Sequence, residues 1–292
     1  MNMPGVTATG GGRSAAAAPV LLKPVLTSDT ASPLLSLPRP WKVRLRFRKG
    51  FLAQSCDDAL FIGTDEASPG PYHLLLSKPD FSQLADWDVG SIVTSHKGRL
   101  GRGRLFIDIS AAVEYGTSAA FLDCAASAWA EKRLGDFLRE ENPETGFGCR
   151  ARMACSEDGP VPFSPMDIIG ARSRLELLKW MIGRGPGLTP SGDDFIIGLL
   201  VVLPQCGELH EQVAALISRP GLTGVVSLAY HRAALARRFD RTLCLMTEAA
   251  VQRNENLFMK ALTQILGHGH SSGADLLCGI LFALSSRGKK GW

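Results

Sequence analysis

No stretch of this 292-residue sequence is hydrophobic for long enough to cross a membrane. The longest apolar runs, 195–203 and 276–284, are each interrupted by a glycine, whereas a spanning helix needs about 18 or more apolar residues. An Ala/Val/Leu run near the N-terminus is broken by Pro19, Lys23 and Pro24 and has no charged segment close before it, so we interpret it as a flexible leader rather than a signal peptide. These absences predict a cytoplasmic protein with no membrane partner.

Paired cysteines and a strong net charge are also missing. The seven cysteines are scattered and never spaced C-x-x-C, which argues against a zinc ribbon or a disulfide framework and favours a reducing compartment. Thirty-two basic residues against 28 acidic ones leave a net charge of +4, too small to imply a nucleic-acid or membrane partner. No Walker A, G-x-S-x-G, H-E-x-x-H or G-x-G-x-x-G motif occurs, and we expect no cofactor.

The hydrophobicity pattern divides the chain into three parts. Residues 1–40 are rich in Gly, Ala, Ser and Pro and predict a flexible arm. Over 41–116, short apolar runs separated by turn residues predict a small antiparallel β barrel or sandwich; Val43, Leu45 and Phe47 alternate with arginines, as in a half-buried strand. Residues 117–292 form a mostly helical domain, with helices expected at 119–140, 167–182, 193–203, 208–217, 225–239, 242–253, 256–266 and 274–285. The expected fold class is α+β.

One pattern occurs twice in the helical part, 81 residues apart. The segments 191–200 (SGDDFIIGLL) and 272–281 (SGADLLCGIL) share S-G-x-D-h-h-x-G-h-L, where h is apolar, and each follows a glycine-rich approach. Ser191 and Ser272 are expected to be N-caps, with Asp194 and Asp275 completing capping boxes. Both helices are apolar on nearly every face and are therefore expected to be buried as a pair.

Two such helix starts, brought together, predict a small-anion site without a metal. Free backbone N–H groups and the positive end of each helix dipole favour an anion, and glycines allow its close approach. The structural alternative is a duplicated helical hairpin that only packs. The candidate catalytic residues are Asp193, Asp194 and His270. The candidate binding residues are Arg184, Gly185, Gly187, Thr189, Ser191, Gly192, His268, Ser271, Ser272, Gly273 and Asp275.

Metal and nucleic-acid sites have weaker support. Asp193 and Asp194 are adjacent but lack further spaced ligands, and His268 and His270 have no nearby Cys or carboxylate partner, so we expect no metal site. A basic cluster over 39–49 and a second over 97–104 could form a nucleic-acid face. A solvated strand face or a subunit contact is the preferred interpretation, because few aromatic residues are interleaved.

The stretch GPGLTPSGDD, followed by GHSSGADLLCG, resembles a bacterial family catalogued as a domain of unknown function that includes the AllH-like subunit of oxamate carbamoyltransferase. The resemblance covers roughly residues 41–286 and is most specific over 185–194. It implies a subunit that acts in allantoin degradation, within purine catabolism, together with an FdrA-like subunit and a third partner subunit. The implied reaction converts oxalurate and phosphate, or a related ureido substrate, into oxamate and carbamoyl phosphate.

Three functions follow from these observations. The first is a carbamoyltransferase subunit with a small-anion site for phosphate, carbamoyl phosphate, oxalurate or oxamate. The second is a non-catalytic scaffold or regulatory subunit whose loops shape a partner's active site. The third is a nucleic-acid-binding protein that uses the basic β face.

Overall fold

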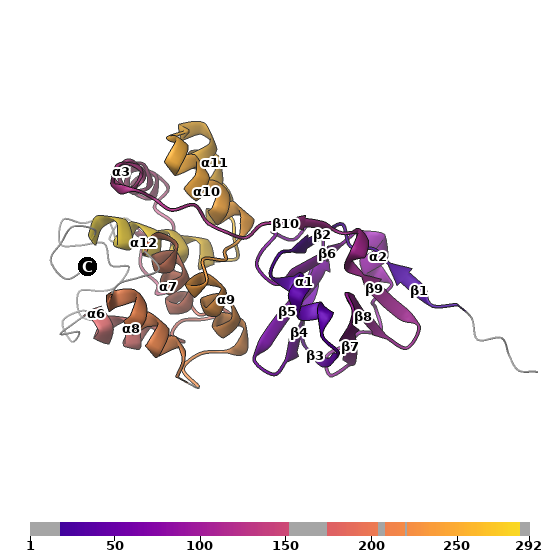
Figure 1. The fold of residues 1–292 in the computed structure, drawn as a ribbon. Helices are drawn as coiled ribbons and strands as arrows, with labels where there is room; N and C mark the ends of the chain where they lie inside the picture. Colours follow the sequence, from indigo (N-terminus) through magenta and orange to yellow (C-terminus); the bar gives the residue numbers. More distant parts are fainter. Residues whose placement is uncertain (1–17, 152–173, 204–207, 220, 287–292) are drawn as a thin grey trace, which may run out of the picture.

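The chain forms a curled β half followed by a helical half (Figure 1). The computed structural model describes residues 18–151, 174–203, 208–219 and 221–286. The first 17 residues of the expected arm, most of the loop at 142–165, the start of the helix expected at 167–182 and the last six residues lie outside this part. The α+β class expected from the sequence is confirmed.

The β half is one curled sheet of ten strands in the order β1-β9-β8-β7-β3-β4-β5-β6-β2-β10. Its hairpins are antiparallel, but β1 pairs with β9, β5 with β6 and β10 with β2 in parallel. The sheet is therefore mixed, where a purely antiparallel one was expected. The strands are Val20–Leu22 (β1), Leu26–Ser28 (β2), Arg39–Phe47 (β3), Gly50–Ser55 (β4), Asp58–Thr64 (β5), His73–Leu76 (β6), Ile92–His96 (β7), Arg99–Arg102 (β8), Leu105–Asp108 (β9) and Val113–Tyr115 (β10).

Residues 20–36, expected in the flexible arm, are instead part of this half. They form β1, β2 and the helix α1 (Ala31–Ser36), and α1 buries Ala31 and Leu35 in the β core. The pairing of β1 with β9 and of β2 with β6 and β10 joins segments far apart in sequence. Composition alone does not report such pairings.

The core of the β half follows the alternation seen in the sequence. Trp41 and Val43 on β3 are fully buried, whereas the intervening Lys42 and Arg44 are exposed. The Trp41 indole N–H donates to Ser95 Oγ at 3.0 Å, which satisfies the polar group of this buried ring. A register shift between Val43 and Leu45 marks a bulge where the strand bends.

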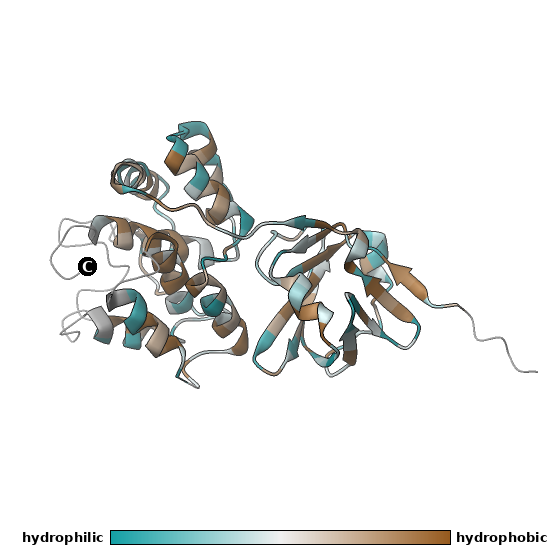
Figure 2. Cartoon of the chain, viewed as in Figure 1, coloured by the Kyte–Doolittle hydropathy of each residue, from teal (hydrophilic) through white to brown (hydrophobic). Residues whose placement is uncertain are grey.

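In the helical half, two apolar helices pack extensively against each other. Every residue of α7 is buried, and Figure 2 shows the apolar character of α7 and α12 in the middle of this half. No helix in the described ranges is both long and apolar enough to cross a membrane. The helices are α3 (Cys124–Glu141), α6 (Arg174–Met181), α7 (Ser191–Val202), α8 (Glu208–Ile217), α9 (Val225–Leu235), α10 (Arg241–Gln252), α11 (Glu255–Leu266) and α12 (Ser272–Ser286), and the β half adds α2 (Lys78–Ser82).

The two halves meet through α9 and the segment that follows it. Tyr230 on α9 bonds His73 on β6, with 2.9 Å between the hydroxyl and Nε2. Arg238 forms an ion pair with Asp29, which also accepts a hydrogen bond from the Thr117 hydroxyl. The loop before β6 also lies next to the helical half, because the Pro69 carbonyl accepts a hydrogen bond from the Arg241 N–H.

Candidate functional site

The two copies of the repeated motif form the tightest helix contact of the helical half. A Cβ built on Gly198 of α7 would lie 2.1 Å from the Leu276 carbonyl oxygen of α12. A Cβ on Gly279 of α12 would lie 2.0 Å from the Phe195 carbonyl oxygen of α7. The expected pairing of the two helices is thus observed, and it depends on a glycine from each copy.

The starts of the two helices differ from the expected capping boxes. Pro190 is the N-cap of α7, no side chain caps this end, and Ser191 is already the first helical residue. The N–H of Gly192 donates to the Arg184 carbonyl, and that of Gly273 donates to the His268 carbonyl. Most first-turn N–H groups of α7 are therefore satisfied by loop carbonyls. This leaves less room for an anion on bare N–H groups than the sequence suggested.

Each acidic residue of the motif interacts with the opposite copy instead of its own. Asp194 of α7 lies beside the Ser272 hydroxyl of α12, which stabilises its charged form. Asp275 of α12 lies beside the Ser191 hydroxyl of α7 and is stabilised in the same way. A capping box would have joined Asp194 to Ser191 and Asp275 to Ser272. The observed exchange brings both carboxyls to the junction of the two helices.

Both carboxyls hold their protons more tightly than an exposed aspartate. Burial raises the pKa of Asp194 well above its ordinary value, and the charges of Asp275 and Asp193 raise it further. Burial raises the pKa of Asp275 to about 6, while the neighbouring Ser191 hydroxyl, the Gly146 N–H and the Ser271 hydroxyl lower it. Two neighbouring carboxyls whose pKa values are raised by different surroundings can serve as a proton donor and a proton acceptor.

A segment that sequence analysis passed over covers this junction. The Gly146 N–H donates to both Asp275 carboxylate oxygens at 3.2 Å. A Cβ on Gly146 would lie 1.8 Å from Ser191 Oγ and 2.7 Å from Ser271 Oγ, so a larger residue here would force both hydroxyls to move. Ser191 Oγ is buried and has no aligned hydrogen-bond partner among the described residues. The sequence signal was only a glycine in a loop of mixed composition.

Asp193 has a different position from its neighbour Asp194. It is fully buried, and its Oδ1 accepts from the Gly183 N–H at 3.0 Å while Oδ2 accepts from the Thr223 hydroxyl. Its Oδ1 also lies 3.7 Å from Nε2 of the buried His231. Asp193 therefore holds the loop before α7 to the start of α9. Sequence analysis suggested Asp193 for a ligand-facing role and did not single out Thr223 or His231 as site residues.

The glycine-rich loop before α7 is distinguished by its backbone conformation and not by charged groups aimed at the carboxyls. Gly183, Gly185 and Gly187 have positive φ angles, and a Cβ on Gly185 would lie 2.7 Å from the Ser191 nitrogen. Arg184 lies over the Trp180 ring, 4.2 Å from its centroid, and donates to the Trp180 carbonyl. Of the loop side chains, Thr189 reaches the carboxyl pair, with its hydroxyl 3.3 Å from Asp194 Oδ2.

Neither candidate histidine forms a side-chain hydrogen bond or ion pair with the two carboxyls in the described part of the chain. His268 is half-buried, and its Nε2 lies 3.2 Å from Ser68 Oγ in a loop of the β half. His270 is exposed and has no hydrogen bond or ion pair with the rest of the described chain. His268 thus joins the second motif loop to the β half, and His270 is the candidate that the described contacts support least.

A pair of hydrogen bonds joins α9 to the β half near the carboxyls. The Gly70 N–H donates to His73 Nδ1 at 3.1 Å, which fixes the tautomer so that Nε2–H donates to the Tyr230 hydroxyl. Burial lowers the pKa of His73 to about 4 and raises that of Tyr230. The charge of Asp194 also raises the Tyr230 pKa, so this phenol lies within electrostatic reach of the junction. Neither residue was expected from the sequence.

The described part of the chain offers little support for a metal site or for a nucleic-acid-binding face. No group of three or more His, Cys, Asp or Glu side chains there could hold a metal ion. Much of the basic cluster on β3 is paired: Arg39 bridges to Asp58, Arg44 bonds Gln54, and Arg46 bonds the Trp87 carbonyl. These contacts fit the preferred interpretation of a strand face.

Comparison with known proteins finds a family similarity within the helical half. Residues 181–284 match the family model described as oxamate carbamoyltransferase subunit AllH. The matched segment runs from the end of α6 into α12 and includes both copies of the motif. No curated protein and no solved structure gives a match. The family resemblance expected from the two motifs is confirmed over residues 181–284, and the match does not extend to the rest of the expected range of about 41–286.

Proposed function

Since the chain is AllH-like over residues 181–284, we propose that it is a subunit of a carbamoyltransferase complex whose reaction uses the carboxyl pair Asp194 and Asp275. The proposed substrates are oxalurate, or a related ureido compound, and phosphate, and the products are oxamate and carbamoyl phosphate. The partners are an FdrA-like subunit and a third subunit. The observation that carries the proposal is the meeting of two buried carboxyls with raised pKa values at the paired helix starts.

The reaction needs both a proton donor and a proton acceptor. A phosphate oxygen attacks the carbamoyl carbon, and the bond from that carbon to the oxamate nitrogen breaks. The departing nitrogen must take up a proton, while the attacking hydrogen phosphate loses one. In the proposal, Asp194 gives the proton to the nitrogen, and Asp275, which is largely ionised at neutral pH, accepts the proton from phosphate.

The surroundings of the pair suit small polar substrates. The Ser191 hydroxyl lacks an aligned partner, and the hydroxyls of Thr189, Ser271 and Ser272 lie within reach of one carboxyl or the other. Hydroxyl and backbone N–H donors could stabilise the charge that develops on a transferring carbamoyl group. Because Asp275 is fully buried, the proposal requires the segment around Gly146 to move, or a partner subunit to displace it, before substrate enters.

A non-catalytic role is the second candidate function, and the complete burial of Asp275 favours it. Asp193 and Asp275 are both fully buried and accept hydrogen bonds from the backbone of other segments. Such contacts stabilise a fold whether or not chemistry occurs there. In this case the helical half would serve as a scaffold that shapes an active site on a partner subunit.

Isosteric substitutions in the assembled complex separate the two candidates. Asp194→Asn and Asp275→Asn keep the shape of each side chain and remove its proton chemistry, and Asp136→Asn, at an exposed site on α3, is the matched control. Carbamoyl phosphate formation from oxalurate and phosphate is the assay. We expect a loss of at least about 100-fold in kcat for the first two variants, with assembly retained and the control unchanged. Full turnover in both would contradict the catalytic role, and a loss that follows failed assembly would favour the scaffold.

A further inference from the structure

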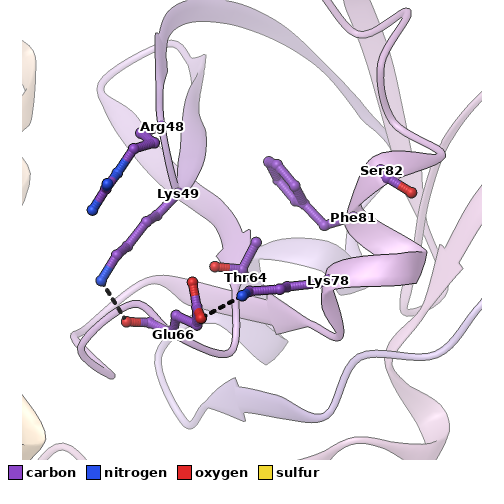
Figure 3. Close-up of a pocket in the computed structure, with 7 residues that line it drawn as sticks. All are labelled: Arg48, Lys49, Thr64, Glu66, Lys78, Phe81 and Ser82. Atoms are coloured by element: carbon purple, nitrogen blue, oxygen red, sulfur yellow. Dashed lines mark hydrogen bonds and ion pairs between the residues drawn. The ribbon is translucent and has the colours of Figure 1, made fainter.

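The β half contains an open pocket that is separate from the motif junction. Its volume is about 670 Å³, within the range of about 300–1,000 Å³ that is usual for small-molecule sites. It lies between the β3–β4 turn, the end of β5 and the short helix α2 (Figure 3). The lining residues are Arg48, Lys49, Thr64, Glu66, Lys78, Phe81 and Ser82.

The pocket has an excess of positive charge. Lys78 Nζ pairs with Glu66 at 2.6 Å, and Lys49 Nζ donates to the Glu66 backbone carbonyl at 3.1 Å. Lys78 chiefly, and Lys49 and Arg48 to a smaller extent, lower the pKa of Glu66, so all three cations act on the same point. Among the lining residues, three cations against one carboxylate leave two positive charges, and Asp65 next to the pocket also acts on Lys78. Arg48 has no ion pair or hydrogen bond with any other described side chain, and Figure 3 shows it beside Lys49.

A buried hydroxyl at the pocket wall also lacks a partner. Thr64 is 7% exposed, and its Oγ1 forms no hydrogen bond within the described chain. In Figure 3 this oxygen is turned toward Lys49 and Glu66. A buried hydroxyl without a partner costs stability, so its position next to unpaired positive charge points to a ligand oxygen that completes its hydrogen bonding.

One wall of the pocket is aromatic. The Phe81 ring lies among the polar residues in Figure 3, and it is 6.0 Å from the Phe51 ring of the β core, which supports it from behind. A half-buried ring of this kind can pack against a flat apolar group. The pocket therefore combines two net positive charges, a hydroxyl donor and an apolar surface.

We propose that this pocket binds a small phosphate monoester with an attached ring. The phosphate, with a charge near −2 at neutral pH, would take the Arg48 guanidinium, the Lys49 ammonium and the Thr64 hydroxyl, and the ring would pack on Phe81. This site is distinct from the carboxyl pair and does not depend on the proposed carbamoyltransferase reaction. The proposal also assigns a ligand to Arg48 and Lys49, the end of the basic cluster that follows β3.

Calorimetric titration of the full chain at low ionic strength with phenyl phosphate, inorganic phosphate and phenol tests the proposal. We expect saturable binding of phenyl phosphate at least tenfold tighter than that of either fragment. Arg48→Gln should weaken it at least tenfold. Arg104→Gln removes the same charge from an exposed arginine outside the pocket, and it should change the affinity less than twofold.

A second substitution separates a specific hydrogen bond to the Thr64 hydroxyl from general charge attraction. Thr64→Val removes the unpartnered hydroxyl at constant shape, so the melting temperature should not fall, while the affinity for phenyl phosphate should drop at least threefold. Absence of saturable binding would overturn the proposal. Equal weakening by Arg48→Gln and Arg104→Gln, or unchanged affinity in Thr64→Val, would also overturn it, because binding would then be due to net charge or to another site.

Discussion

Gly198 and Gly279 occupy equivalent positions in the contact between α7 and α12. Each faces the backbone carbonyl of the residue three positions before the other, Leu276 in one direction and Phe195 in the other. A Cβ built on Gly198 would also lie 3.1 Å from the Ile280 nitrogen, and a Cβ built on Gly279 would lie 3.1 Å from the Leu199 nitrogen. The repeat in the sequence, with its offset of 81 residues, is therefore also a local pseudo-two-fold symmetry of the helix pair.

The first prediction concerns this contact. Gly198→Ala should lower the free energy of unfolding by about 3 kcal/mol, because the new Cβ would meet a backbone carbonyl that cannot turn away. Gly135→Ala on α3 is the matched control, since its Cβ would meet only side-chain atoms at 3.6 and 3.9 Å. The control should be neutral or stabilising by up to about 1 kcal/mol, through helix propensity. Urea denaturation measures both, and equal stability of the two variants would contradict the close packing.

The pairing of the two helices could be predicted from the sequence, but the roles of their aspartates could not. Apolar helices that share a motif must bury the same faces, and glycine at the same position in both allows a close approach. Asp193 and Asp194 are adjacent in sequence, yet one accepts hydrogen bonds from Gly183 and Thr223 while the other lies by Ser272. That division depends on which way the helix faces α9 and α12, which a single sequence does not reveal.

In the β half, local patterns predicted strands and missed their long-range partners. The alternation around Val43 reports a strand because one face is buried and the other is solvated. The three-residue strands β1, β2 and β10 are too short to show a period, and their parallel partners are distant in sequence. The link from His73 to Tyr230 was missed for the same reason, since it joins residues 157 positions apart.

A second prediction follows from the buried position of Asp193. Asp193→Ala should destabilise the protein by about 3 kcal/mol, because it leaves the Gly183 N–H and the Thr223 hydroxyl without their acceptor. Thr223→Val should cost about 1–2 kcal/mol, and its effect should largely disappear when it is combined with Asp193→Ala. Chemical denaturation of the two single variants and the double variant measures this coupling. Simple additivity of the two losses would show that the contact contributes nothing.

The third prediction is a pH dependence of stability at Asp275. Its pKa is raised to about 6 in the folded chain, from 3.8 for an ordinary aspartate, so folding takes up a proton between these values. The contribution of Asp275 to stability therefore decreases as the pH rises from about 4 to 6. Relative to the natural chain, Asp275→Asn should gain up to about 3 kcal/mol across that window, since asparagine does not titrate. Urea titrations at several pH values measure the difference, and a constant difference would contradict the raised pKa.

The fourth prediction concerns His73 and has the opposite sign. Burial lowers the pKa of His73 to about 4, from 6.5 for an ordinary histidine, so the unfolded chain binds more protons between these values. The stability contributed by neutral His73 is present above pH 6.5 and is lost as the pH falls toward 4. In His73→Gln this acid-dependent loss should shrink by up to about 3 kcal/mol, because glutamine does not titrate.

Comparison with His96→Gln distinguishes a buried histidine from a general loss of histidine charge. His96 lies at an exposed position of β7, so its replacement is the matched control. Asp275 titrates in the same window with the opposite sign, so the two effects partly cancel in the natural chain and become visible in the single variants. If His73→Gln and His96→Gln give the same pH profile, burial does not hold the His73 imidazole neutral.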